Sequence, residues 1–214
     1  MRSALLTCGI VAALLYIATD VAASILYPGY SLTDQAVSEL FAIGAPTSRI
    51  VVPLFSLCSL LLLAFACGLW ISSDQNKRLR FMAMMFAGSA IVGLVLWNLF
   101  PMHMRGAERS FTDTMHLILA TNPFVLLSLA VGVATFRCWF RWYTAATIFM
   151  LLLPAAFAFH YAPEVQANLP TPGLGLGERA AQYAYNSWQV ALAVVLLRSE
   201  IANSPRRQPA RRLS

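Results

Sequence analysis

The side chains that could do chemistry in this sequence are few, and they lie close to the ends of long apolar stretches. Asp20 lies near the end of the first stretch, and Glu39 follows in the loop after it. His116 opens the fourth stretch, while Glu178 and Arg179 stand just before the sixth. An acid inside an apolar segment needs a partner or water, and such residues commonly mark a functional site. These five residues are therefore the candidate ligand-binding set.

A metal centre is an alternative use of the same region. Asp20, His116 and His160 carry groups that could coordinate zinc. Glu39 or Glu178 would then act as general base on a bound water, as in a membrane-embedded metal-dependent hydrolase. Two histidines from facing helices could instead ligate haem b. The sequence itself requires neither cofactor, and it contains none of the motifs GxGxxG, GxSxG and HExxH, so whether the protein is an enzyme stays open.

The elements that position these groups must lie in lipid. Hydrophobic residues make up 59% of the 214 residues and charged residues only 11%, against about 25% charged residues in soluble domains. A chain with so little charge cannot cover a water-facing surface with polar groups, so the composition excludes a soluble globular protein. We therefore predict an all-α, polytopic integral membrane protein, a six-helix bundle whose main partner is the lipid bilayer.

Six apolar stretches are long enough to cross a bilayer core, which needs roughly 20 residues of helix. They are apolar on all sides rather than alternating, which disfavours the strands of a membrane barrel. We predict one membrane domain over residues 1–198, followed by a basic, disordered cytoplasmic tail over 199–214. The predicted spans lie near residues 4–26, 50–72, 81–100, 115–136, 143–161 and 180–197.

The Lys and Arg residues predict the orientation of these spans. With the N-terminus in the cytoplasm, 11 of the 15 basic residues fall on the cytoplasmic side and 4 on the outer side, as the positive-inside rule favours. We therefore expect a multi-pass protein of the cytoplasmic membrane with both termini cytoplasmic. Because the basic residues are scattered over loop ends, we expect no nucleic-acid binding. A transport path in a chain of this size would need a homodimer.

Polar residues within the spans are concentrated on the predicted outer side. Asn122 lies two turns into the fourth span, and Asn186 and Gln189 share one face of the sixth. Polar residues that only face the lipid headgroups would be expected at both ends of the helices. The pattern instead favours an outward-facing polar pocket that binds a small ligand or a lipid headgroup.

The first outer loop has the sequence of a cap over this pocket. Ser31 and Asp34 match a helix-capping box. Apolar residues then recur at helical spacing from Leu32 to Phe41, and Gly44 ends the pattern. This periodicity predicts a short amphipathic helix over 31–43 that lies on the outer surface or between the spans.

This loop also resembles a known family. Three motifs of the loop carry the resemblance: Tyr27-Pro28-Gly29-Tyr30-Ser31, Val37-Ser38-Glu39-Leu40 and Gly44-Ala45-Pro46-Thr47. Outside the loop, Phe100-Pro101, His116 and Gly177-Glu178-Arg179 add to it. They resemble the prokaryotic domain-of-unknown-function family nine-nine-eight, over most of residues 5–198. The resemblance implies six membrane helices, a bacterial or archaeal host and the cytoplasmic membrane, but no activity. The chain departs from the family at Met102-His103, where a more acidic stretch is expected, so His103 is a weaker candidate than His116.

Overall fold

The computed structural model describes residues 1–203, and the regular structure in that range is helical apart from one isolated bridge between Ile43 and His103. Five helical stretches are long and apolar enough to cross a membrane, which confirms the predicted multi-span class. They are α1 (Arg2–Leu26), α2 (Ser48–Ser72), α3 (Lys77–Ile91) with η2 (Val92–Leu96) and α4 (Trp97–Leu99), α5 (Phe111–Ala120) with α6 (Pro123–Thr135), and α7 (Cys138–Gln166).

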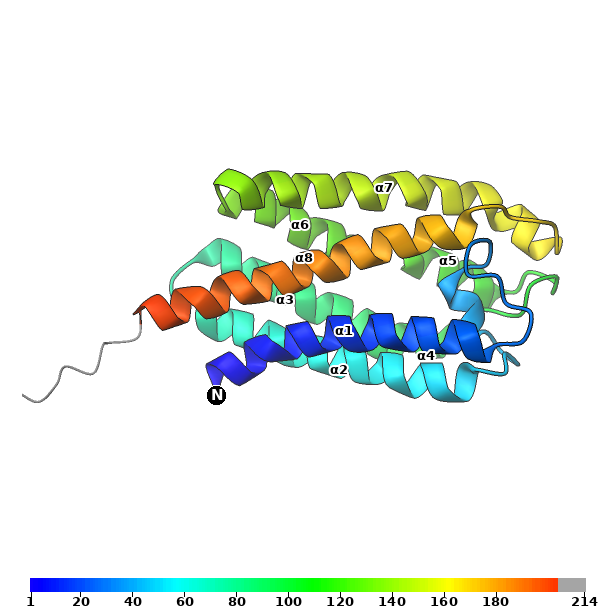
Figure 1. Ribbon diagram of the computed structural model, residues 1–214, viewed down its shortest axis with the longest axis horizontal. Helices are drawn as coiled ribbons and strands as arrows, with labels where there is room; N and C mark the ends of the chain where they lie inside the picture. The colour runs from blue at the N-terminus through cyan, green and yellow to red at the C-terminus, as the bar shows by residue number, and fades with distance from the viewer. Residues whose placement is uncertain (204–214) are drawn as a thin grey trace, which may run out of the picture.

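A sixth long helix, α8 (Leu174–Asn203), completes the predicted all-α bundle. It does not count among the apolar spans because its first half is rich in polar residues, yet it packs between α1 and α7 (Figure 1). The neighbours run α1, α2, α3, α6, α7, α8 and back to α1, so the helices form a closed ring.

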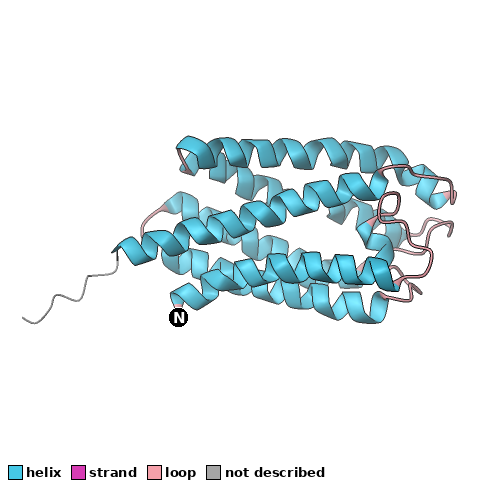
Figure 2. Ribbon diagram, in the orientation of Figure 1, coloured by secondary structure: helices cyan, strands magenta, loops and turns pink. Residues whose placement is uncertain are grey.

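The two ends of the ring differ. Figure 2 shows the long connections gathered at one end, which we call the loop end. They are residues 27–47, 100–110 and 167–173. The N-terminus and the far end of α8 both lie at the opposite, short-loop end (Figure 1).

Aromatic side chains fill the half of the ring nearer the short-loop end. Phe65, Phe86 and Trp188 are fully buried, and the Phe86 and Trp188 rings stack at 6.0 Å between centroids. The Trp188 indole also donates a hydrogen bond of 2.9 Å to Thr144 Oγ1, so its polar atom is satisfied inside the core. Packing of this density leaves space for a cavity only toward the loop end.

The first loop departs from the predicted helix over 31–43. Only η1 (Val37–Phe41) is helical, as a 3-10 turn, and Leu32 is 40% exposed rather than part of a buried stripe. The physical reason is competition for backbone groups. Leu32 O accepts from Arg179 instead of from the Ala36 N–H, and that N–H donates to Glu39 Oε1. The loop is thus folded by tertiary contacts, with Val37, Leu40 and Phe41 buried beneath it.

Two of the predicted spans are interrupted. The third contains the π-helical segment η2, and the fourth breaks at Asn122, whose φ of 28° ends α5 before Pro123 begins α6. Helix α8 extends past the predicted span to Asn203, so the predicted tail begins as helix, and its residues 204–214 lie outside the described range.

Candidate functional site

Asp20 of α1 and Arg179 of α8 form a buried ion pair near the loop end. Arg179 Nη2 lies 2.8 Å from Asp20 Oδ1, and Arg179 Nε lies 3.0 Å from Oδ2. The Arg179 side chain is 3% exposed and the Asp20 side chain 0% exposed, so the pair is removed from solvent. The Tyr183 hydroxyl donates a second hydrogen bond to Asp20 Oδ2. A bidentate pair with added hydrogen bonds is the geometry in which a buried carboxylate is best tolerated.

The same guanidinium holds the first loop in place. Arg179 Nη1 donates to Leu32 O at 2.8 Å and to Gln35 O at 3.1 Å, and Nη2 donates to the Tyr30 hydroxyl at 2.7 Å. Burial raises the pKa of Tyr30, although the neighbouring Arg179 opposes this shift. All three guanidinium nitrogens of Arg179 donate hydrogen bonds, so the ion pair connects α1, α8 and the first loop and is not an open binding site.

A second ion pair joins the first loop to the next one. Arg105 donates two hydrogen bonds to the Glu39 carboxylate, from Nη2 to Oε1 at 2.9 Å and from Nε to Oε2 at 3.0 Å. It also donates to Thr171 Oγ1. Asp34 accepts a hydrogen bond from the Gly173 N–H at 2.9 Å. This bond and the Ser31 hydroxyl hold the pKa of Asp34 below its usual range. Three loops are therefore tied together at this end of the bundle.

Glu178 is placed differently from the other two acids. Its Oε2 accepts the Val37 N–H at 2.8 Å, and it makes no ion pair with a described residue. Its side chain also lines a cavity of about 490 Å³. Among the described residues, Glu178 is the only Asp, Glu, Lys or Arg that lines this cavity.

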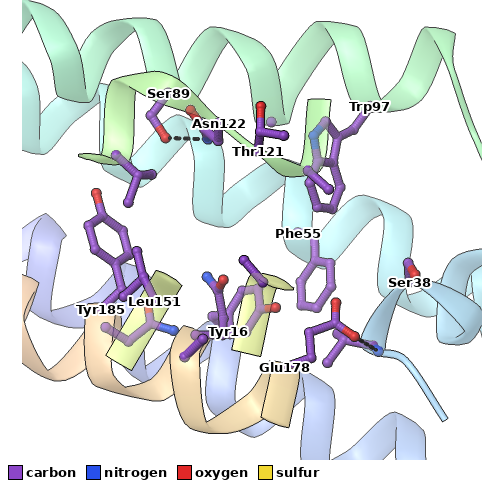
Figure 3. A pocket seen from close by; sticks show the side chains of 18 of the residues that line it. Tyr16, Ser38, Phe55, Ser89, Trp97, Thr121, Asn122, Leu151, Glu178 and Tyr185 are labelled. Carbon is purple, nitrogen blue, oxygen red and sulfur yellow. Dashed lines mark hydrogen bonds between the residues drawn. The ribbon is translucent and has the colours of Figure 1, made fainter. Parts of the chain in front are cut away.

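This cavity occupies the loop-end half of the ring, between the aromatic core and η1. Figure 3 shows Ser89, Asn122 and Trp97 on one side of it, and Tyr16, Tyr185 and Glu178 on the other. Most of the lining is apolar, but Asn122 Oδ1, Asn186 Nδ2 and Trp97 Nε1 are buried without a hydrogen-bond partner in the structure. Buried polar atoms are normally paired, so their presence in a cavity wall calls for an explanation.

The cavity opens sideways. Five of its lining residues are exposed, and all of them lie at one gap in the ring: Ala120 and Thr121 at the end of α5, and Leu152, Ala155 and Phe159 on α7. Leu152 and Phe159 are 51% and 45% exposed. One side of this mouth is formed by α7, which is one of the membrane-length helices.

The histidines lie in separate surroundings. His116 is 6% exposed, donates one hydrogen bond from Nδ1 to Phe100 O at 3.0 Å, and lies with its ring centroid 5.1 Å from that of Trp97. His103, in the second long loop, lies 3.0 Å from Asp113 of α5. His160 is exposed on α7. No group of three or more metal-binding side chains gathers within the part of the chain that the structure describes, and these surroundings lend no support to a haem site.

The candidate set is therefore divided among four environments. Asp20 and Arg179 bind each other, Glu39 pairs with Arg105, His116 lies beside Trp97, and Glu178 alone enters the cavity wall. Arg105 was counted only among the four basic residues of the outer side and was not predicted as a partner of Glu39. An acid in an apolar setting needs a cation or a hydrogen-bond donor, and this rule could have pointed to a basic partner for Glu39.

The residues of the family motifs are those that build this end of the molecule: Tyr30 and Glu39 of the first loop, and Glu178 and Arg179 at the start of α8. Neither curated proteins nor solved structures gave a significant match. The model of the family described as "Protein of unknown function (DUF998)" matches residues 10–195, and the chain belongs to that family.

Proposed function

We propose that this protein binds an amphipathic molecule of the bilayer in the cavity inside the ring of helices, which residues of all six long helical stretches line. The observation that carries the proposal is the combination of unpaired buried polar atoms, an apolar lining and a sideways mouth in one space. A molecule that enters from the bilayer would bring an apolar chain together with a polar group, which is the chemistry that this lining can accept.

The volume and the polar groups are consistent with a small amphipathic ligand. About 490 Å³ falls within the usual range of small-molecule pockets, about 300–1,000 Å³. An unpaired amide group in apolar surroundings costs about 1–3 kcal/mol or more. A ligand that accepts from Asn186 Nδ2 and donates to Asn122 Oδ1 would remove this cost. The unpaired amides therefore favour a ligand that carries a polar group over a purely apolar one.

We further propose that the loop end faces outward, so that the cavity lies in the outer half of the membrane. Described Lys and Arg residues are more numerous at the short-loop end, where Arg78 and Arg141 donate to the last carbonyls of α6. Such an excess is typical of the cytoplasmic side. The basic residues of the short-loop end are Arg2, Lys77, Arg78, Arg80, Arg137, Arg141 and Arg198; those of the loop end are Arg49, Arg105, Arg109 and Arg179.

A reporter that is active only outside the cytoplasm tests this orientation. Fused after Gly44 or Gly173, which both lie at the loop end, it should be active, and fused after Asn76 it should be silent. A C-terminal fusion should be silent as well, because the end of α8 lies beside the N-terminus. Activity after Asn76 together with silence after Gly173 would reverse the proposed orientation.

Ligand binding can be measured with 12-bromododecanol, since bromine quenches tryptophan fluorescence and Trp97 lines the cavity. With the protein in lipid nanodiscs, we expect quenching that saturates. The variant Ala155→Phe narrows the mouth and should weaken saturable quenching about tenfold or more, whereas Ala156→Phe should not. Ala156 is the matched control because it is exposed on the same helix and is not a lining residue.

The variant Trp97→Phe identifies the reporting residue, because it removes the fluorophore in the cavity wall and should abolish most of the saturable signal. Quenching that rises linearly with probe, and that is the same in the wild type, Ala155→Phe and Ala156→Phe, would reflect mere partitioning into lipid. That result would refute binding in the cavity.

A further inference from the structure

The three acids of the candidate set do not all have a basic partner. Asp20 is neutralised by Arg179 and Glu39 by Arg105, each through two hydrogen bonds. Glu178 is the third acid, and no basic side chain among the described residues forms an ion pair with it. A carboxylate in an apolar cavity is costly unless a cation or hydrogen-bond donors face it. The cavity wall thus has one acid without a basic partner among the described residues.

A continuous set of aromatic rings also lines the cavity. Tyr16 stacks on Phe55 at 4.6 Å between centroids, and Phe41 lies 5.7 Å from both Phe55 and Trp97. All four rings line the cavity. They belong to one hydrophobic cluster with Val37, whose N–H donates to Glu178, so the carboxylate is hydrogen-bonded to a member of this cluster. In Figure 3, Trp97 lies across the cavity from Tyr16 and Glu178.

A carboxylate beside aromatic faces is the chemistry that recognises an ammonium group. The electron-rich faces of Trp, Tyr and Phe attract a cation, and this attraction is strongest where the site is desolvated. An anionic head would be repelled by Glu178, and a neutral head would leave its charge uncompensated. The cavity therefore distinguishes head groups by their charge.

We propose that the ligand of this cavity is an amphiphile with an ammonium head, which lies between the Glu178 carboxylate and the rings of Tyr16, Phe55 and Trp97. This inference rests on the proposed function, since it names the class of molecule that enters the same cavity. The apolar chain would extend toward the mouth between α5 and α7, where the exposed lining residues are apolar except for Thr121.

Competition against 12-bromododecanol in nanodiscs tests the assignment. We use three probes of one chain length, dodecyltrimethylammonium, dodecanol and dodecyl sulfate, at concentrations below those that form micelles. In the wild type the ammonium probe should displace 12-bromododecanol about 10- to 100-fold more effectively than dodecanol, as expected for one charge-assisted contact with added cation–π attraction. Dodecyl sulfate should be the weakest competitor.

The variant Glu178→Gln should reduce the preference for the ammonium probe over dodecanol at least about tenfold. A circular dichroism spectrum like that of the wild type shows that the variant is folded. Phe55→Leu should reduce the preference by a smaller factor. Glu108→Gln is the matched control, since Glu108 is exposed in a loop at the same end and does not line the cavity, and it should behave like the wild type.

The possible failures are distinguishable. If 12-bromododecanol gives no saturable quenching, the proposed function itself fails. If it does, but the three head groups compete equally or Glu178→Gln keeps the full preference, only the ammonium assignment is overturned. Tetramethylammonium, which has no chain, should compete poorly. Competition as strong as that of the long-chain probe would retain the ammonium site but would place its ligand in water, against the proposed entry from the bilayer.

Discussion

Replacing Arg179 with methionine is expected to lower the free energy of unfolding by about 3–5 kcal/mol, the usual cost of leaving a buried charge without its partner. Asp20 is 0% exposed, and Arg179 provides two of its hydrogen bonds. The variant also removes the donors to Leu32 O and Gln35 O, so the first loop loses the contacts that fold it. The effect should therefore be among the largest of any single substitution at this end of the protein.

A double-mutant cycle separates the ion pair from the other contacts of Arg179. Asp20→Leu alone should be destabilising, because it strands the guanidinium, and the double variant Asp20→Leu/Arg179→Met should cost clearly less than the sum of the two single variants. Unfolding by sodium dodecyl sulfate, followed by circular dichroism, gives the three values. Arg109→Met, at an exposed loop position, is the control and should be near neutral. Additive costs in the cycle would mean that the pair is not a unit.

The helical bundle could be predicted from the sequence because hydropathy depends on local composition. The boundaries of α1 and α2 lie within two residues of the predicted spans. The break at Asn122 also has a local cause, since Pro123 cannot donate the backbone hydrogen bond of a helix interior. These are features that each segment of the chain determines by itself.

The pairing of the polar residues could not be predicted in the same way. Asp20 and Arg179 were both candidates, but they are 159 positions apart, and their contact depends on α8 packing beside α1. The first loop shows the limit most clearly. Its apolar period is that of a helix, yet Arg179 binds carbonyls that a helix would use, and a 3-10 turn results. The cavity is likewise a property of the whole ring, because it exists only where side chains from several helices fail to meet.

Gly175, near the start of α8, lies where this helix approaches the first loop closely. A Cβ atom at Gly175 would lie 2.6 Å from Leu32 O and 2.9 Å from Arg179 Nη1, with Gln35 O nearer still. Two of these three neighbours are backbone carbonyls, which cannot turn aside as a flexible side chain can. Only a residue without a side chain lets α8 approach the loop closely enough for Arg179 to reach Leu32 O and Gln35 O.

We therefore expect Gly175→Ala to be destabilising by about 1–3 kcal/mol through overpacking, although the change adds only a methyl group. Gly177→Ala is the matched control in the same helix. Its Cβ would have its nearest neighbour at 3.6 Å, an ordinary contact with Pro154, so that the better helix propensity of alanine should leave stability unchanged or raised by up to about 1 kcal/mol. Unfolding in sodium dodecyl sulfate measures both variants. Equal stability of Gly175→Ala and Gly177→Ala would show that the loop can move away from α8, and that Arg179 does not require this close approach.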